Sequence, residues 1–105
     1  MSMKERRHTV LQHAEKAKDC HIIAAFEPEN IFYLTGFWGE AIAVCMDNGT
    51  TTKLITPKLE YSRAEKTSID CEVFATERGS ELISTFVSQV KGSRVCSDCS
   101  DYSTV

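Results

Sequence analysis

Two short, mostly apolar runs constrain the fold of this chain more than any other feature. They are "HIIAAF" (His21–Phe26) and "AIAVCM" (Ala41–Met46). Each run is too short to form a helix of its own, and neither alternates polar with apolar residues as a strand with one face in water would. The runs therefore predict two strands of a sheet that is covered on both faces, with helices packed above and below it.

Helical patterns surround these two strands. Met3 to Lys18 has the spacing of an amphipathic helix. Pro28 suits the first turn of a second helix, and Gly36 suits the left-handed residue that ends it. Lys58 to Lys66 predicts a third, charged surface helix. The apolar or small positions of the first helix are Met3, Val10, Leu11, Ala14 and Ala17, and those of the third are Leu59, Tyr61 and Ala64.

The remaining strands follow from turn residues and short apolar runs. Asn48-Gly49 is a dipeptide favoured in tight hairpins, so "TKLIT" (residues 52–56) is expected to return antiparallel to the strand before it. Cys71–Ala75 and "RVCS" (residues 94–97) predict two further strands. The sheet is therefore expected to contain both parallel and antiparallel pairs.

A last helix lies between these two strands. Ser80 is expected to cap it, and Gly92 to end it. Its apolar stripe consists of Leu82, Ile83, Phe86, Val87 and Val90. The order of elements predicts one domain over residues 1–105, of class α/β, with three layers (α/β/α) and a mixed sheet. A helix-capping pattern at Ser100 or Asp101 indicates a frayed tail or the front piece of a longer polypeptide.

The charge balance gives no reason to expect nucleic acid. The formal net charge is -3 and the pI is near 5.6, whereas nucleic-acid binding needs a concentrated basic face. The only dense basic run, Lys4, Arg6 and Arg7, is interpreted as a solvated helix start rather than a phosphate-binding patch.

The sequence also predicts a cytoplasmic location without a membrane partner. No apolar run approaches the roughly 20 residues that span a bilayer, and the first residues lack the apolar centre of a secretory signal. The five cysteines are odd in number and scattered, which is typical of reduced thiols rather than a disulfide framework.

No recognisable catalytic constellation emerges from the residues. There is no Gly-x-Ser-x-Gly elbow and no Gly-rich phosphate loop. His8 and His13 are five residues apart, so they lie on different sides of a helix. The pairs Glu77/Glu81 and Glu60/Glu65 could be drawn as acid and base, but they are interpreted as a charged surface.

Cys96 and Cys99 form a Cys-x-x-Cys that Cys20 and His21 could join as a zinc or redox site. The adjacent Cys20 and His21 make a poor ligand pair. The alternative, which we favour, is that Cys20, Cys45, Cys71 and Cys96 are small buried hydrophobes in or beside strands.

The stretch "PENIFYLTGF" (Pro28–Phe37) resembles the N-terminal domain of the creatinase and prolidase family, the non-catalytic half of Xaa-Pro peptidases. The resemblance extends over roughly residues 4 to 105 and implies the ribonuclease H-like fold of that domain. The residues at matching positions are Asn30, Ile31, Tyr33, Leu34, Thr35 and Gly36.

The resemblance implies chemistry outside these residues. The family's active site lies in a following domain of "pita-bread" fold, which binds two divalent metals (Mn or Co) through two Asp, one His and two Glu. That catalytic domain is absent from this sequence, so no catalytic or metal-binding residue is expected here. The resemblance further implies a homodimer in which loops of this domain narrow the partner's active site and help to select short peptides with proline in second position.

The residues after the motif are the candidates for that role. Phe37 and Trp38 are expected to form an aromatic lip, with Glu40 beside them, that meets substrate or a second subunit. The alternative is that Trp38 folds back over the edge of the core. Asn30 is expected to cap or lock the turn, and Tyr33 to anchor the bend. A second hypothesis for the whole chain is a stand-alone binding or assembly module of the same fold.

Overall fold

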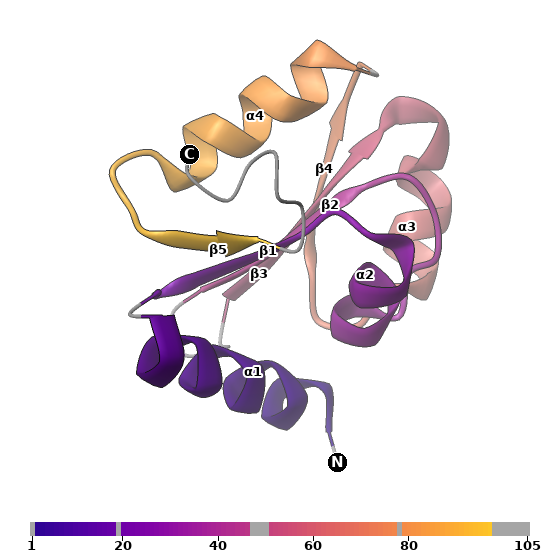
Figure 1. Ribbon diagram of the computed structural model, residues 1–105. Helices are drawn as coiled ribbons and strands as arrows, with labels where there is room; N and C mark the ends of the chain where they lie inside the picture. The colour runs from indigo at the N-terminus through magenta and orange to yellow at the C-terminus, as the bar shows by residue number, and fades with distance from the viewer. Residues whose placement is uncertain (1, 19, 47–50, 78, 98–105) are drawn as a thin grey trace.

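The computed structural model describes residues 2–18, 20–46, 51–77 and 79–97 (Figure 1). They form a mixed five-stranded sheet with four α-helices and a short 3-10 helix, as the sequence predicts for an α/β fold. The elements are α1 (Met3–Lys18), β1 (Ile22–Ala25), α2 (Pro28–Thr35), β2 (Ile42–Met46), β3 (Thr51–Pro57), η2 (Lys58–Glu60), α3 (Tyr61–Thr67), β4 (Glu72–Thr76), α4 (Ser80–Val90) and β5 (Val95–Ser97).

The strands lie in the order β4-β3-β2-β1-β5. β2 pairs antiparallel with both β1 and β3, so the predicted hairpin return is confirmed, although its turn at Asn48-Gly49 falls outside the described residues. β1–β5 and β3–β4 are parallel pairs. β1, β3, β4 and β5 therefore run in the same direction, and their carboxyl ends lie at the same end of the sheet.

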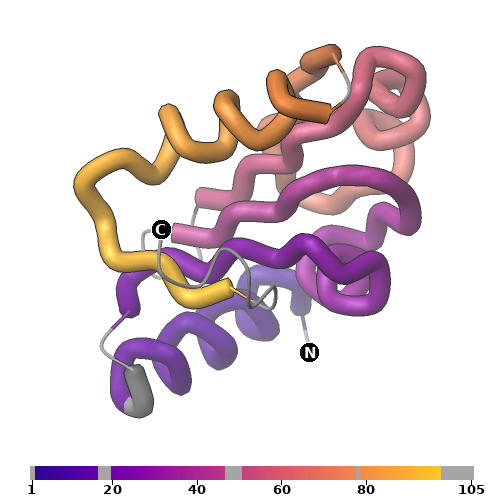
Figure 2. The backbone as a smooth tube through the Cα atoms, turned by 45° about the horizontal axis from the view of Figure 1, so that its top comes forward, coloured from indigo at the N-terminus to yellow at the C-terminus, as the bar shows by residue number. Residues whose placement is uncertain are grey.

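Helices cover both faces of the sheet, with α4 on one side and α1 and α2 on the other (Figure 2). Side chains alternate between these faces along each strand, as the pleat requires. The cluster facing α4 contains Ile22, Ala24, Ile42, Val44, Ile55, Leu82, Phe86, Val90 and Val95. The opposite cluster, under α1, α2 and α3, contains Leu11, Ala25, Ile31, Leu34, Phe37, Ala41, Ala43, Cys45, Leu54 and Ala64.

The α4 face is built from the stripe that the sequence predicts. Leu82, Phe86 and Val90 are buried, and the Phe86 ring meets the Phe26 ring edge-on at 5.3 Å. The expected cap is wrong: Ser80 is the first helical residue, and Gly79, with φ 77°, precedes the helix without a side-chain cap. Glycine adopts this left-handed backbone with little strain, so it can begin the helix without a capping side chain.

The opposite face contains a buried arginine. The Arg7 side chain is 1% exposed. Its Nε donates to the Leu34 carbonyl at 2.8 Å, its Nη1 to the Asp70 carbonyl at 3.1 Å, and its Nη2 to the Ile69 carbonyl and to Cys71 Sγ. The prediction of a solvated helix start is therefore wrong for Arg7, because these backbone carbonyls need donors that water does not supply there.

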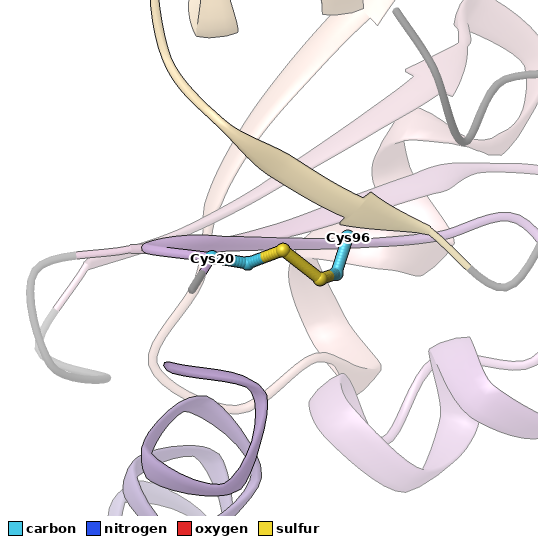
Figure 3. The surroundings of a disulfide bond; sticks show 2 residues. All are labelled: Cys20 and Cys96. Atoms are coloured by element: carbon cyan, nitrogen blue, oxygen red, sulfur yellow. A yellow bond between two sulfur atoms is a disulfide. The ribbon is translucent and has the colours of Figure 1, made fainter. Parts of the chain in front are cut away.

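The interpretation of all cysteines as reduced thiols is also wrong. Cys20 and Cys96, 76 positions apart in sequence, form a disulfide with Cα atoms 5.8 Å apart (Figure 3). Cys45 and Cys71 are free thiols. Burial raises the pKa of Cys45 from its ordinary value of 9.0 to about 11, and burial also raises the pKa of Cys71.

The segment after β3 differs in detail from its prediction. It is a 3-10 turn followed by α3 rather than one helix. Ala64 is completely buried, but Leu59 is 82% exposed and does not anchor the segment. Among the helices that the structure describes, none has both the length and the apolar character needed to cross a membrane.

Candidate functional site

The candidate site is built on helix α2 and the loop that follows it. Pro28 occupies the first turn, and Gly36 ends the helix with φ 84° while its N–H donates to the Phe32 carbonyl at 2.8 Å. Ile31 and Leu34 lie in the core one turn apart, as their spacing predicts. Both ends of this helix are therefore set by residues visible in the sequence.

Thr35 fixes the direction in which the chain leaves α2. Its hydroxyl donates to the Ile31 carbonyl at 2.7 Å and accepts from the Phe37 N–H at 3.0 Å. Its carbonyl accepts from the Ile69 N–H at 2.8 Å. The two hydroxyl bonds are buried, and the three bonds together hold the loop to both α2 and the segment before β4.

Two expected roles within the motif are corrected by the structure. Glu27, not Asn30, is the residue that precedes α2, so Asn30 is not the cap. Tyr33 does not anchor the bend in the core, since it is 48% exposed. The Arg6 guanidinium lies 4.6 Å from the centre of the Tyr33 ring and donates to the Tyr33 carbonyl at 2.9 Å. Arg6 thus partners the end of α2 as well.

Phe37 does not belong to a projecting lip, because its side chain is 0% exposed. The ring packs in the core, with the Arg63 guanidinium 4.7 Å from its centre. Gly39 makes this packing possible: a Cβ at Gly39 would lie 2.8 Å from the Phe37 ring and 2.6 Å from Arg63 Nη2. Phe37 therefore anchors the loop to the core.

Trp38 is the aromatic residue that projects. It is 53% exposed, and its ring meets the Phe32 ring edge-on at 6.0 Å. Its carbonyl accepts a hydrogen bond of 2.7 Å from Arg63, which is in turn ion-paired with Glu60. The Trp38 ring thus packs on another exposed ring rather than folding over the core, while its backbone is held in place.

The sequence analysis missed Phe32, the other member of this aromatic pair (Phe32 and Trp38). Phe32 is 51% exposed. Its exposure follows from helical phase, because Ile31, Leu34 and Thr35 occupy the buried side of α2 and leave Phe32 on the opposite side. The same argument from periodicity could have identified it.

Glu40 is exposed at the end of the loop. It lines a pocket of about 240 Å³ with Pro57, Leu59 and Glu60, between the loop and η2. Glu40 also lines a groove of about 810 Å³ along the start of α4. A negatively charged side chain therefore stands where the loop, η2 and α4 approach one another.

The carboxylate pairs considered from the sequence are engaged at the surface. Glu77 is ion-paired with Lys58 at 2.7 Å, and Glu81 accepts from the Glu77 N–H. Glu65 accepts from the Tyr61 hydroxyl at 3.1 Å, and this bond raises the pKa of Tyr61. The charged-surface interpretation is confirmed for these side chains.

The disulfide bears on the hypothesis of a zinc or redox site at Cys96 and Cys99. Cys96 is bonded to Cys20, so in this state it offers no thiolate to a metal, and Cys99 lies outside the described residues. Within residues 2–18, 20–46, 51–77 and 79–97, no three His, Cys, Asp or Glu side chains gather closely enough to hold a metal ion.

Comparison with known proteins agrees with the family resemblance seen in the sequence. Residues 7–104 match the profile of the creatinase/prolidase N-terminal domain. A search of curated proteins found no match. The fold resembles a creatinase/prolidase-like N-terminal domain from Corynebacterium diphtheriae, with a TM-score of 0.75 and 20% identity over 95% of this chain and 77% of that one.

Longer proteins show the same fold in part of their length. The prolidase from Pyrococcus horikoshii matches with a TM-score of 0.73 and 17% identity, over 91% of this chain but 26% of its own. An Xaa-Pro aminopeptidase (aminopeptidase P) structure from Streptococcus thermophilus matches with a TM-score of 0.66 and 18% identity, over 91% of this chain and 74% of its own. This chain therefore spans about a quarter of the archaeal prolidase.

Proposed function

The chain belongs to the creatinase/prolidase N-terminal domain family, and on this premise we propose that it is the non-catalytic N-terminal domain of a metal-dependent Xaa-Pro peptidase. Its proposed roles are dimerisation and control of substrate access. The partner is a second copy of the subunit, and the substrate is a short peptide with proline in second position. We assign catalysis and the two divalent metals, Mn or Co, to another domain of the parent protein.

The observation that carries this proposal is the aromatic pair on a rigid support. Phe32 and Trp38 are each about half exposed, yet the backbone beneath them is held by Thr35, Arg63 and the buried Phe37. Large rings on a fixed backbone lose little entropy on binding, and such residues dominate the energetics of interfaces. Trp38 and Glu40 are therefore the residues proposed to contact substrate or partner, with Phe37 positioning them.

The proposed cytoplasmic location has less support than the proposed role. It rested on the apolar runs and the first residues of the sequence, with five reduced thiols as further support, and the Cys20–Cys96 disulfide removes that further support. The redox state of this pair in cells would test the location directly.

Association of the chain itself tests the dimerisation role. We expect Trp38→Ala to weaken self-association, measured by sedimentation equilibrium, by about tenfold or more, the effect of losing an interface residue worth at least about 1.4 kcal/mol. Lys91→Ala is the control, since Lys91 is exposed at the C-terminal end of α4. Equal dimer affinity for wild type and Trp38→Ala would contradict this role.

The parent enzyme tests the gating role. Reading the gene beyond the Val105 codon should reveal a second domain with spaced Asp, Asp, His, Glu and Glu. In that enzyme we expect Trp38→Ala to lower kcat/KM for an Xaa-Pro dipeptide, whereas Lys91→Ala, at an exposed position, should leave it unchanged. Unaltered kinetics would refute gating, and a stop codon after Val105 would favour the stand-alone module instead.

A further inference from the structure

We propose that the Cys20–Cys96 disulfide is a redox-responsive latch that holds the edge strand β5 against β1, and that its chemical partner is a dithiol reductant. Figure 3 shows the bond running from the chain just before β1 to the middle of β5. This inference does not depend on the proposed function, because it uses only the edge of the sheet formed by β1 and β5.

Noncovalent contacts hold β5 weakly. The strand has three residues and pairs with β1 alone, at the end of the strand order. Val95 is its buried side chain, packed with the cluster under α4. At the opposite edge, β4 makes five paired positions with β3 instead of three. The disulfide therefore adds to a ladder that is short for a stable edge.

The two cysteines of the bond differ in exposure. Cys20 is 7% exposed, whereas Cys96 is half-buried and, with Ser97, forms part of the wall of a pocket of about 430 Å³. The other walls come from α1, β1 and α2, including His13, Ile23 and Tyr33. A thiolate approaching from this pocket would meet the Cys96 sulfur first.

The reaction is an ordinary thiol–disulfide exchange. One thiolate of the reductant attacks Cys96 Sγ, a mixed disulfide forms, and the Cys20–Cys96 bond breaks with Cys20 leaving as a thiolate that takes up a proton. The second thiol of the reductant, as a thiolate, then attacks the reductant sulfur that is bonded to Cys96. The mixed disulfide breaks, and Cys96 is released as a thiolate that takes up a proton. The protein gains two electrons and two protons, and the reductant becomes a disulfide.

Opening the bond has a local structural consequence. The disulfide is the covalent tie between β5 and the chain just before β1, so its loss leaves β5 held only by its short ladder with β1 and by Val95. Without the bond, β5 separates from β1 more often. Separation uncovers the outer backbone edge of Ile22–Ala25 and removes the Cys96–Ser97 wall of the pocket.

Hydrogen exchange measured by mass spectrometry tests the latch. The protein carries Cys99→Ser so that Cys99 cannot exchange into the pair, and it is compared oxidised and after treatment with dithiothreitol. We expect reduction to accelerate amide exchange at least tenfold in peptides covering 22–25 and 95–97. Peptides covering β3 and β4 should be accelerated much less, by the general loss of stability that follows removal of a long-loop disulfide. Cys20→Ser/Cys96→Ser should exchange like the reduced protein with or without dithiothreitol.

A matched control and two outcomes make the test decisive. Cys71→Ser removes a free thiol from the other end of the sheet and should leave the redox response intact. Equal exchange in the oxidised and reduced protein, with the bond shown open by a gain of two hydrogens, would overturn the latch. Equal acceleration across β1, β3, β4 and β5 would also overturn it, since the bond would then stabilise the whole domain.

Discussion

The two faces of the sheet are covered by different physical means. One helix, α4, covers one face with a cluster of apolar side chains. The other face lies under α1, α2 and α3, and there a buried guanidinium joins α1 to the end of α2 and to the segment before β4. The comparison shows that hydrophobic periodicity suffices for one face, whereas the other also needs polar bonds between distant segments.

The largest effect should come from removing the guanidinium. We expect Arg7→Met to lower the free energy of unfolding by about 4 kcal/mol, because the carbonyls of Leu34, Ile69 and Asp70 lose their donor and an unsatisfied buried group costs about 1–3 kcal/mol. Urea denaturation followed by Trp38 fluorescence measures this. Lys4→Met, at an exposed position of the same helix, is the control. If Arg7→Met lowered the free energy of unfolding by less than about 1 kcal/mol, the claim that this face depends on polar bonds would be wrong.

A comparable but smaller loss is expected on the α4 face. Phe86 is 1% exposed and touches Phe26. Phe86→Ala should cost about 3 kcal/mol, the lower end for truncating a buried aromatic ring. Val87→Ala, next to it but partly exposed, should cost less than about 1 kcal/mol. Similar losses for the two variants in the same urea titration would show that the stripe does not hold α4 down.

High pH should weaken the α1–α2–α3 face through its buried thiol. Since burial raises the pKa of Cys45 from 9.0 to about 11, the unfolded chain loses its proton first. The stability from the neutral thiol is present below pH 9 and is lost as the pH rises towards 11, by about 2–3 kcal/mol. The difference in unfolding free energy between wild type and Cys45→Val, at pH 8 and 11, isolates this effect. A difference independent of pH would contradict it.

The smallest expected effect concerns Gly36 and Gly92, two of the three described glycines with positive φ. Gly36→Ala should cost about 1–2 kcal/mol, because φ is 84° and a Cβ would lie 3.2 Å from the Thr67 carbonyl oxygen and 3.3 Å from Ile69 Cδ1. Gly92→Ala, with φ 82° and no atom within 4 Å, should cost about 1 kcal/mol. Thermal denaturation of both variants separates crowding from backbone strain. A larger loss at Gly92 would reverse that assignment.

Most of the fold could be predicted from the sequence because it depends on local patterns. The apolar runs of β1 and β2, the stripe of α4 and the Pro28–Gly36 boundaries each lie within a few residues. The role of Arg7 could not, since its acceptors are backbone carbonyls and carry no signature in sequence. The Cys20–Cys96 pair was missed for a related reason: an odd, scattered set of cysteines does not reveal which two strands become neighbours.

The candidate site likewise contains features that local sequence predicts and features that depend on tertiary contacts. The exposure of Phe32 was accessible through helical phase and the projection of Trp38 was expected, but the burial of Phe37 was not. That burial depends on Arg63 and on the space left by Gly39, and both contacts come from the tertiary arrangement. Two adjacent aromatic residues can thus have opposite environments, which composition alone does not distinguish.

The reach of Arg7 also bears on the order of events during folding. Its acceptors lie 27 and 62 residues away along the chain, so its bonds form only after α2 and the segment before β4 have both docked. We therefore expect Arg7 to join the structure after the main folding barrier. In stopped-flow experiments, Arg7→Met should leave the refolding rate nearly unchanged and accelerate unfolding. The guanidinium would then govern how long the native state lasts, rather than how quickly it is reached.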